Sequence, residues 1–124
     1  MQISNSEKIL MDVLWMSSSK SHPLSAKQII ERIDTKLDWH DKTVKTLLNR
    51  LLKKQAISFC KEGRGYLYYP ILKESEYVNE ASEHFLSRVF NGSVSSLVAS
   101  FAKQEKLTEK DLAELKSLIN KMEK

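Results

Sequence analysis

Residues that cross-link, kink or loosen a fold are scarce in this chain of 124 residues, which contains one cysteine, two prolines and three glycines. A single cysteine cannot form an internal disulfide, and the three histidines show no ligand spacing with Cys60, so we expect no metal site and no cofactor. No apolar run approaches the roughly 20 residues that a membrane span requires, and the first residues lack a signal-peptide pattern. We therefore expect a cytoplasmic protein without membrane insertion.

The groupings of residues that carry out catalysis are missing as well. Paired carboxylates, a nucleophile with its base and a phosphate-cradling loop do not occur at a usable spacing. Cys60 has no activating base nearby in the sequence, so we interpret it as a bystander rather than a nucleophile. The sequence therefore gives no reason to expect an enzyme.

Acidic residues are absent from one stretch, Lys42 to Lys61, which carries six cations and no carboxylate. Residues 1–70 hold 12 Lys and Arg against 7 Asp and Glu, whereas residues 71–124 hold 8 against 9. The positive charge of the chain therefore belongs to its first part. A helix exposed only to water usually mixes both signs, so charge of one sign indicates a polyanionic ligand.

Residues 39–54 have the pattern of an amphipathic helix. The apolar positions recur at i, i+3, i+4, i+7 and i+8 and should be buried: Val44, Leu47, Leu48, Leu51 and Leu52. The outward positions mix cations with hydroxyl and amide groups: Lys42, Thr43, Lys45, Thr46, Asn49, Arg50 and Lys53. Thr and Asn are short and reach bases only if the helix lies in the major groove. We therefore predict a recognition helix for double-stranded DNA, with an ordinary solvated surface helix as the alternative.

Two further helices are predicted ahead of this stretch, and each starts with a capping box. Residues 4–16 begin with the pattern S-x-x-E and residues 25–34 with S-x-x-Q, in both cases with an apolar stripe behind it. Three short helices of which the last is basic are typical of a helix-turn-helix domain. Trp15 and Trp39 are expected in its core, although an indole N–H near a helix start could instead contact a phosphate.

After residue 54 the apolar residues alternate with period two, which is typical of β-strands. Residues 57–60 and 66–69 flank the turn Glu62-Gly63-Arg64-Gly65, and Pro70 ends the second strand. A hairpin that directly follows a recognition helix is a wing. Arg64 can swing onto a phosphate or into the minor groove, or it can simply be exposed at the tip of a strand pair that closes the core. The tyrosines of the second strand can likewise pack or reach the DNA backbone.

The rest of the chain is predicted to form three helices, beginning near Ser75, Ser93 and Thr108. Their apolar stripes contain Val78, Phe85, Val89, Val94, Leu97, Val98, Phe101, Leu112, Leu115, Leu118 and Ile119. Three short helices in roughly fifty residues make a poor core alone, so we expect them to join a second copy in a homodimer. The alternative is that they fold back onto the winged domain of the same chain. The predicted fold is mainly α with a small β-hairpin wing, divided into a winged-helix DNA-binding domain (residues 1–71) and a helical dimerisation region (residues 72–124).

Several motifs are spread over essentially the whole chain. They are I-S-x-x-E at residues 3–7, I-I-E at 29–31, W-x-x-K-T-V-K-T-L-L-x-R-L at 39–51, Y-Y at 68–69, and S-L-V at 96–98 followed by L-T at 107–108. Together they resemble the penicillinase-repressor family, which includes repressors of β-lactamase and methicillin-resistance genes.

This resemblance implies a homodimer that binds inverted-repeat operators containing TACA/TGTA and blocks transcription. Carried over by position, the implied base readers are Lys42, Thr43 and Thr46. The implied phosphate contacts are Lys45, Arg50, Lys54 and Arg64. Two departures from the family pattern lie at the ends of the recognition helix: His40-Asp41 stands where Ser-Pro is usual, and Gln55 stands where glycine is usual.

The resemblance also bears on induction. In the inducible members, a membrane sensor-protease signal leads to cleavage inside the dimerisation region, typically at an Asn-Phe bond. The matching bond here is Ser100–Phe101, and this departure bears on both the inactivating cleavage and the indirect control by a sensor-protease. Copper-responsive relatives end in a cysteine-rich motif that residues 120–124 lack, so copper sensing is not expected.

Two other classes of function remain open at this stage. An architectural DNA-binding protein would bind DNA without preference for sequence. A winged helix used only for protein contact would lose nothing when Lys42 and Thr46 are replaced by alanine. A repressor differs from both because it selects one sequence through its recognition helix.

Overall fold

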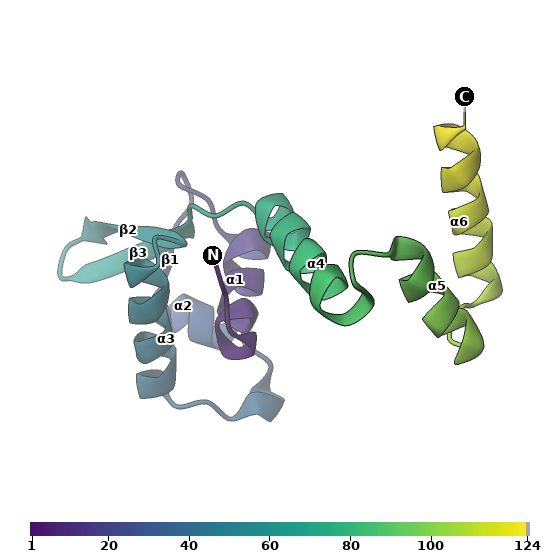
Figure 1. Cartoon of the computed structure of the whole chain (residues 1–124). Coiled ribbons are helices and arrows are strands. Elements are labelled where there is room, and N and C mark those ends of the chain that lie inside the picture. Colours follow the sequence, from purple (N-terminus) through teal and green to yellow (C-terminus); the bar gives the residue numbers. More distant parts are fainter. Residues whose placement is uncertain (124) are drawn as a thin grey trace. The chain divides into compact units, whose positions relative to one another are not determined.

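The computed structural model describes residues 1–123 and confirms the predicted combination of helices with a small β-hairpin (Figure 1). The elements follow the order α1 (Asn5–Ser17), β1 (Leu24–Ser25), α2 (Ala26–Glu31), the 3-10 helix η1 (Thr35–Leu37), α3 (Asp41–Lys53), β2 (Ile57–Glu62), β3 (Gly65–Pro70), α4 (Glu74–Phe90), α5 (Val94–Lys103) and α6 (Glu109–Met122). The chain forms two compact units, Met1–Ala81 and Ser82–Lys124, and the division between them falls within α4.

The first two helices begin at the predicted capping boxes. The Ser4 hydroxyl accepts a hydrogen bond from the Glu7 amide at 3.1 Å, and Glu7 Oε1 accepts one from the Ser4 amide at 2.8 Å. Ser25 and Gln28 form the same reciprocal pair at 3.2 and 2.9 Å. Each box satisfies two amides that have no partner within a first helical turn, and this fixes where α1 and α2 start.

The second helix is shorter than predicted, because α2 ends at Glu31 rather than near Asp34. The side chain of Asp34 accepts a hydrogen bond from the Lys36 amide at 2.9 Å. This local bond offers the backbone an alternative to continued helix, so the chain turns into η1 instead. An apolar repeat does not reveal such a bond, and η1 was therefore not predicted.

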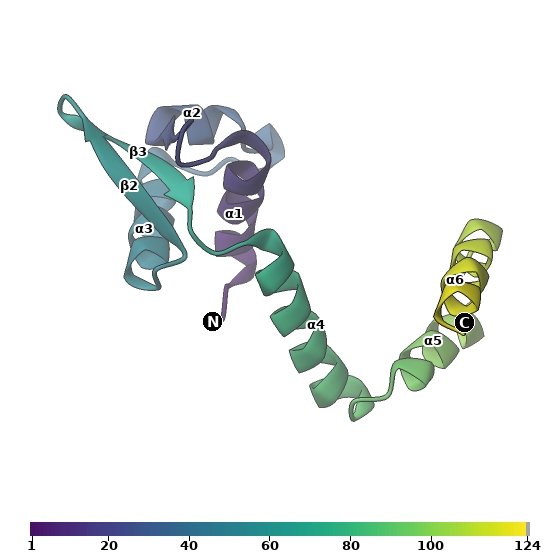
Figure 2. The same cartoon turned by 90° about the horizontal axis from the view of Figure 1, so that it is seen from above.

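The hairpin predicted after α3 forms as β2 and β3, and β3 also pairs with β1 in an antiparallel sheet of order β1-β3-β2. Phe59 lies opposite Tyr68, and Lys61 lies opposite Tyr66. Gly63 at the turn has a φ of +62°, a left-handed conformation that glycine adopts without strain. The tip of the hairpin projects beyond the helices of the first unit (Figure 2). β1 was not predicted because two residues are too few to show an alternating pattern.

The core of the first unit lies where α1, α2, α3 and the sheet meet. Its buried apolar side chains are Leu10, Met11, Leu14, Leu24, Ile29, Ile33, Val44, Leu47, Leu48, Leu51, Ala56, Ile57 and Tyr68. Most of the predicted stripe of α3 is therefore buried, although Leu52 is only partly so. Trp15 and Trp39, which were expected in the core, are partly buried and pack against this cluster from its edge.

Two helices of the second half, α5 and α6, begin where the sequence indicated, whereas α4 begins at Glu74, so that Ser75 lies inside the helix rather than before it. Asn91 and Gly92 have φ values of +52° and +83°, and these left-handed residues end α4. Ser93 caps the start of α5, and Thr108 caps the start of α6 in a capping box with Asp111. Backbone conformation therefore ends α4, and side-chain bonds mark the starts of α5 and α6.

Glu7 is buried, with 1% of its surface exposed, and it joins α1 to the end of α3. Its Oε1 accepts a hydrogen bond from Lys54 Nζ at 2.5 Å, and the same ammonium group donates to the Gln2 carbonyl oxygen at 2.9 Å. Burial alone would raise the pKa of Glu7, but the hydrogen bonds from Lys54 and Ser4 outweigh it and hold the pKa below its ordinary value. One carboxylate therefore both caps α1 and pairs with the residue that ends α3.

Glu7→Gln should lower the free energy of unfolding by roughly 1 to 2 kcal/mol at neutral pH, less than for a fully buried ion pair because Lys54 is partly exposed. A carboxyl group with a lowered pKa stabilises the fold above its unfolded-state pKa, and this contribution is lost as the pH falls through its folded-state value. The gap between wild type and variant should therefore begin to narrow below about pH 4.3, the ordinary pKa of a glutamate, and close as the pH falls through the lower folded-state pKa. Urea unfolding at neutral and acidic pH measures both effects.

Asp12→Asn is the matched control for Glu7→Gln. Asp12 forms an exposed ion pair with Lys8 at 2.7 Å, and its loss should cost less than about 1 kcal/mol. Equal costs for the two variants, or a gap at neutral pH that persists in acid, would contradict the role assigned to Glu7.

Candidate nucleic-acid interface

The start of α3 departs from a well-capped helix. His40 precedes the first turn and makes no side-chain capping bond. Asp41 lies in the first turn, where a carboxylate interacts favourably with the positive end of the helix dipole. The helix start therefore depends on Asp41 and on core packing rather than on a cap.

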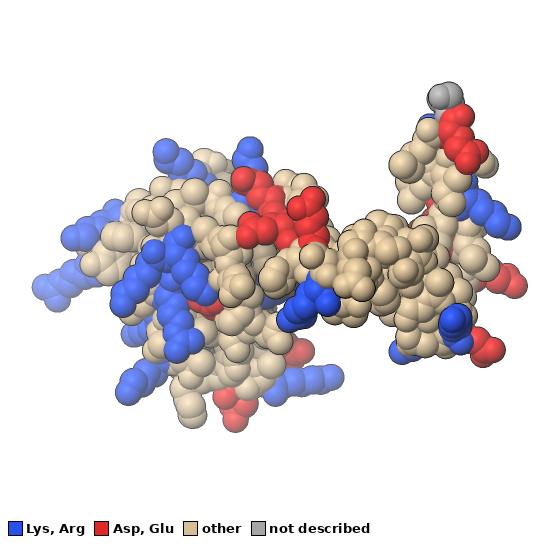
Figure 3. Space-filling view, in the orientation of Figure 1, with Lys and Arg blue, Asp and Glu red and all other residues tan. Residues whose placement is uncertain are grey.

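The outward face of α3 carries the residues predicted to contact DNA, and all of them are exposed: Lys42, Thr43, Lys45, Thr46, Asn49 and Arg50. They line two grooves that flank the helix. Trp39 and His40 complete the groove that holds Lys42, Thr43, Thr46 and Arg50. Lys and Arg side chains gather over this side of the first unit (Figure 3). The arrangement presents cations and short polar groups together on one rigid helix.

The second groove lies between α3, α2 and β3, and it adds residues that the sequence did not single out. Lys27 from α2 and Tyr66 from β3 line it together with Lys45 and Asn49. Two carboxylates line it as well, so its charge is mixed. A lone lysine on a short helix carries no pattern, and only tertiary packing brings Lys27 beside α3.

Thr46 has a specific hydrogen-bonding state. Its hydroxyl donates a hydrogen bond to the Lys42 carbonyl oxygen at 2.9 Å. Because the proton is used inside the helix, the oxygen remains free to accept a bond from a base amino group, and the methyl group can contact a thymine methyl. Thr46 is therefore suited to accept a hydrogen bond or to make an apolar contact.

The hairpin carries Arg64 at its tip, where the side chain is exposed. Behind the tip, the rings of Phe59 and Tyr66 meet edge to face with centroids 4.6 Å apart, and Lys61 Nζ lies 5.8 Å from the centre of the Tyr66 ring. Tyr68 is buried, which raises the pKa of its phenol, whereas Tyr66 is largely exposed. Of these two tyrosines, one therefore packs in the core and the other is available to a ligand.

The C-terminal end of α3 differs from the rest of its outer face, because the Lys54 ammonium group is held by Glu7. The next residue, Gln55, has a φ of +62° in the left-handed region, at the position where the family resemblance led us to expect glycine. A non-glycine residue pays roughly 1 kcal/mol for this conformation. The amide of Ala56 donates to the Leu51 carbonyl at 3.0 Å and closes the end of the helix.

Apolar side chains are exposed along the helices of the second half. Within the part of the chain that the structure describes, α4, α5 and α6 contain no buried residue. The exposed members of the predicted dimerisation set are Val78, Phe85, Val89, Val94, Phe101, Leu112, Leu118 and Ile119, and the partly buried members are Leu97, Val98 and Leu115. These helices therefore present apolar stripes that their own unit leaves uncovered.

The candidate cleavage bond, Ser100–Phe101, lies inside α5. The Ser100 hydroxyl accepts a hydrogen bond from the side-chain amide of Gln104 at 3.1 Å. Proteases bind their substrates as extended chains, so cleavage at this bond would require local unfolding of α5.

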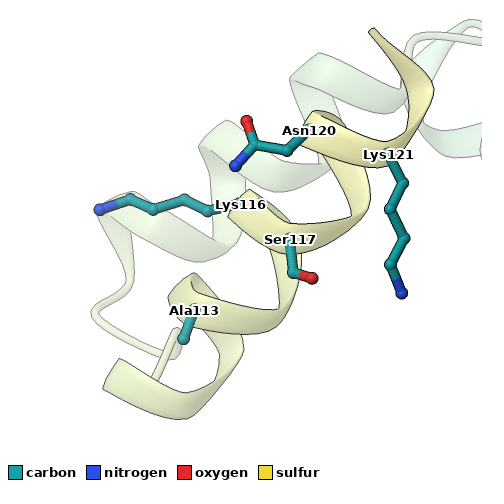
Figure 4. Close-up of a pocket in the computed structure, with 5 residues that line it drawn as sticks. All are labelled: Ala113, Lys116, Ser117, Asn120 and Lys121. Carbon is teal, nitrogen blue, oxygen red and sulfur yellow. The ribbon is translucent and has the colours of Figure 1, made fainter. Parts of the chain in front are cut away.

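A shallow hollow on α6 does not resemble a ligand site. The side chains around it all come from one helix, namely Ala113, Lys116, Ser117, Asn120 and Lys121. Lys116 and Lys121 point in different directions from the helix (Figure 4). This is the polar side of α6, away from the apolar stripe.

Residues 1–123 contain neither a cluster of metal ligands nor a membrane-spanning helix. No group of three or more His, Cys, Asp or Glu side chains lies close enough together to hold a metal ion. No helix in this range combines the length and the apolar character needed to cross a membrane.

The similarity to known proteins covers nearly the whole chain. The family model described as penicillinase repressor matches residues 3–121. The methicillin resistance regulatory protein MecI of Staphylococcus aureus is 35% identical over 120 residues, which cover 97% of this chain and 94% of that protein. The penicillinase repressor of Bacillus licheniformis is 35% identical over 118 residues, which cover 95% and 89%.

Solved structures agree with this assignment. The DNA-binding domain of the repressor BlaI matches with a TM-score of 0.53 and 37% identity, covering 61% of this chain and 88% of that structure. MepR, a transcription regulator of Staphylococcus aureus, matches with a TM-score of 0.50 and covers 98% of this chain and 78% of its own, but at 20% identity it supports the fold alone. The chain therefore belongs to the penicillinase repressor family of winged-helix DNA-binding repressors.

Proposed function

We propose that this chain represses transcription in the cytoplasm by binding an inverted-repeat operator as a homodimer and occluding the promoter. The observation that carries the proposal is the outer face of α3, where exposed cations alternate with Thr and Asn on a helix whose other side is locked in the core. Cations attract any duplex, but short polar side chains reach base edges only when the helix enters the major groove. The family match supplies the setting for this interpretation.

The residues of the interface fall into two groups, according to the part of the DNA that their side chains can reach. In this proposal Lys42, Thr43 and Thr46 read bases near the start of α3, together with Asn49 one turn later. The longer side chains contact phosphates: Lys45, Arg50 and, at the hairpin tip, Arg64. The Lys54 ammonium group already donates to Glu7 and to the Gln2 carbonyl oxygen, which leaves it one donor for a phosphate, so in this proposal it contributes least.

The helices of the second half are the proposed dimerisation region, residues 72–124. Their uncovered apolar stripes support this role, because large exposed apolar surfaces mark places where another chain packs. Two linked winged domains also gain effective concentration on a symmetric target, which one domain lacks.

The names of the relatives support a proposal for the genes that this chain regulates. MecI is described as a methicillin resistance regulator and the Bacillus licheniformis protein as a penicillinase repressor. By analogy, we propose that this chain controls genes for β-lactam resistance or related genes. Indirect control by a membrane sensor-protease would act at Ser100–Phe101 after local unfolding of α5.

Thr46→Ala should reduce discrimination at one base pair of the operator by roughly 1 to 3 kcal/mol, because it removes both the hydroxyl oxygen and the methyl group. Thr46→Ser keeps the oxygen and Thr46→Val keeps the methyl group, so the variant that retains discrimination identifies the contacting group. Competition binding against duplexes changed at single positions measures the effect.

Lys45→Ala is the comparison for the Thr46 series, because a phosphate contact carries no sequence information. It should weaken all duplexes alike and reduce the slope of log affinity against log salt by about 1. A protein-contact module predicts no change in either series, and an architectural protein predicts that Thr46→Ala leaves the sequence preference unaltered.

Leu118→Asp should dissociate the homodimer, because it puts a charged side chain in place of an apolar one that is 55% exposed in the single chain and would be buried between the two copies. The variant should sediment as a monomer and still bind a half-site through its intact winged domain. Ser117→Asp introduces the same charge on the polar side of the same helix and should remain dimeric. A monomeric wild type, or equal effects of the two substitutions, would contradict the dimer.

A further inference from the structure

We propose that Trp15 is a positioning residue for the recognition of two half-sites, because it fixes the point at which α4 leaves the DNA-binding unit. The inference rests on the proposed homodimer and goes beyond it by naming what controls the distance between its two reading helices. The residues that carry it all belong to the first unit, Met1–Ala81.

The segment between β3 and α4 is tied to the end of the recognition helix. The amides of Ile71 and Leu72 both donate to the Ala56 carbonyl oxygen, at 2.9 and 3.0 Å. Ala56 is buried, and its amide donates a hydrogen bond to the Leu51 carbonyl oxygen, which ties Ala56 to the end of α3. A shift of this segment would therefore break bonds to the residue that closes α3.

Trp15 holds the same segment from the side of α1. Its indole Nε1 donates to the Leu72 carbonyl oxygen at 2.8 Å. Its ring lies 5.6 Å, centroid to centroid, from the ring of Tyr77 in the first turn of α4. Lys8 Nζ lies 5.9 Å from the centre of the Tyr77 ring and is itself held by Asp12 at 2.7 Å. The segment that leads into α4 is therefore held at a backbone carbonyl, and the first turn of α4 is contacted at a side chain.

Core packing alone does not require this arrangement. A phenylalanine would keep an aromatic ring in most of this partly buried space, but only the indole N–H can hold the Leu72 carbonyl, and that carbonyl belongs to a connecting segment rather than to a helix or strand. The gain from linking two modules depends on how narrowly the connection matches the separation of their sites. A loosened junction would lower the effective concentration and leave each module intact.

Trp15→Phe tests this inference, because it keeps an aromatic ring and removes the N–H donor. Affinity for a single half-site should stay within about twofold of wild type, since the bonds from Ile71 and Leu72 to Ala56, which hold the end of α3, do not involve the indole N–H. Affinity for the full inverted repeat should fall about tenfold, which is one decade of the ~100- to 10,000-fold gain that linkage can provide. Operators with one or two base pairs added between the half-sites should lose less affinity than they do with wild type.

Tyr77→Phe is the matched control and should behave as wild type, because it retains the ring that Trp15 contacts. Tyr77→Ala removes that ring from a partly exposed position and should repeat the effect of Trp15→Phe, which keeps the test decisive if Trp15→Phe does not fold. Thermal unfolding of each variant confirms that the winged domain is intact.

An equal loss on half-site and full operator would show a merely structural role and overturn the proposal, as would an unchanged response to spacing. Failure of the homodimer itself has a different signature, because wild type would then show no gain for an inverted repeat over a half-site. That result would overturn both proposals, and it is read from the wild type alone.

Discussion

Burial of one side of α3 is the constraint on which the rest of the structure depends. Val44, Leu48 and Leu51 have no exposed surface, and each such side chain contributes about 1.5 to 3 kcal/mol by leaving water. Because a helix can bury only one side, the same packing that builds the core holds Lys42 and Asn49 outward at fixed spacing. This burial compensates for the missing cap at the start of α3, since a side-chain cap contributes only about 1 kcal/mol.

The two halves of the chain differ in how far their apolar residues are buried. In the first unit they form a closed core, and the one buried carboxylate described there, Glu7, is paired with Lys54. In α5 and α6 the apolar stripes stay at the surface of the single chain. A second copy would cover them, and pairing would also place two reading helices on one duplex. The segment held by Trp15 connects the DNA-binding unit to the helices that are proposed to pair with a second copy.

Local signals in the sequence predicted most of the fold, because periodicity and capping boxes act over a few residues. They located α1, α3, the hairpin and the tail helices, and charge of one sign together with the family resemblance singled out the outward face of α3. They failed where a single side-chain bond decides the structure. The bond between Asp34 and the Lys36 amide favours the turn after α2, so this helix is shorter than predicted. Lys54, expected at a phosphate, forms an ion pair with Glu7, which is distant in the sequence. Lys27 beside α3 and the Trp15 bond to Leu72 were beyond reach for the same reason, since both depend on which elements pack together.

The central claim is that the outer face of α3 reads DNA sequence in duplicate. Selection of bound duplexes from a random pool, at moderate ionic strength and with the purified full chain, tests it most directly. The account predicts that the selected duplexes share an inverted repeat whose two halves are related by a two-fold axis, as a symmetric dimer requires. Recovery of duplexes with no common sequence, or of a single half-site without its symmetric partner, would contradict it.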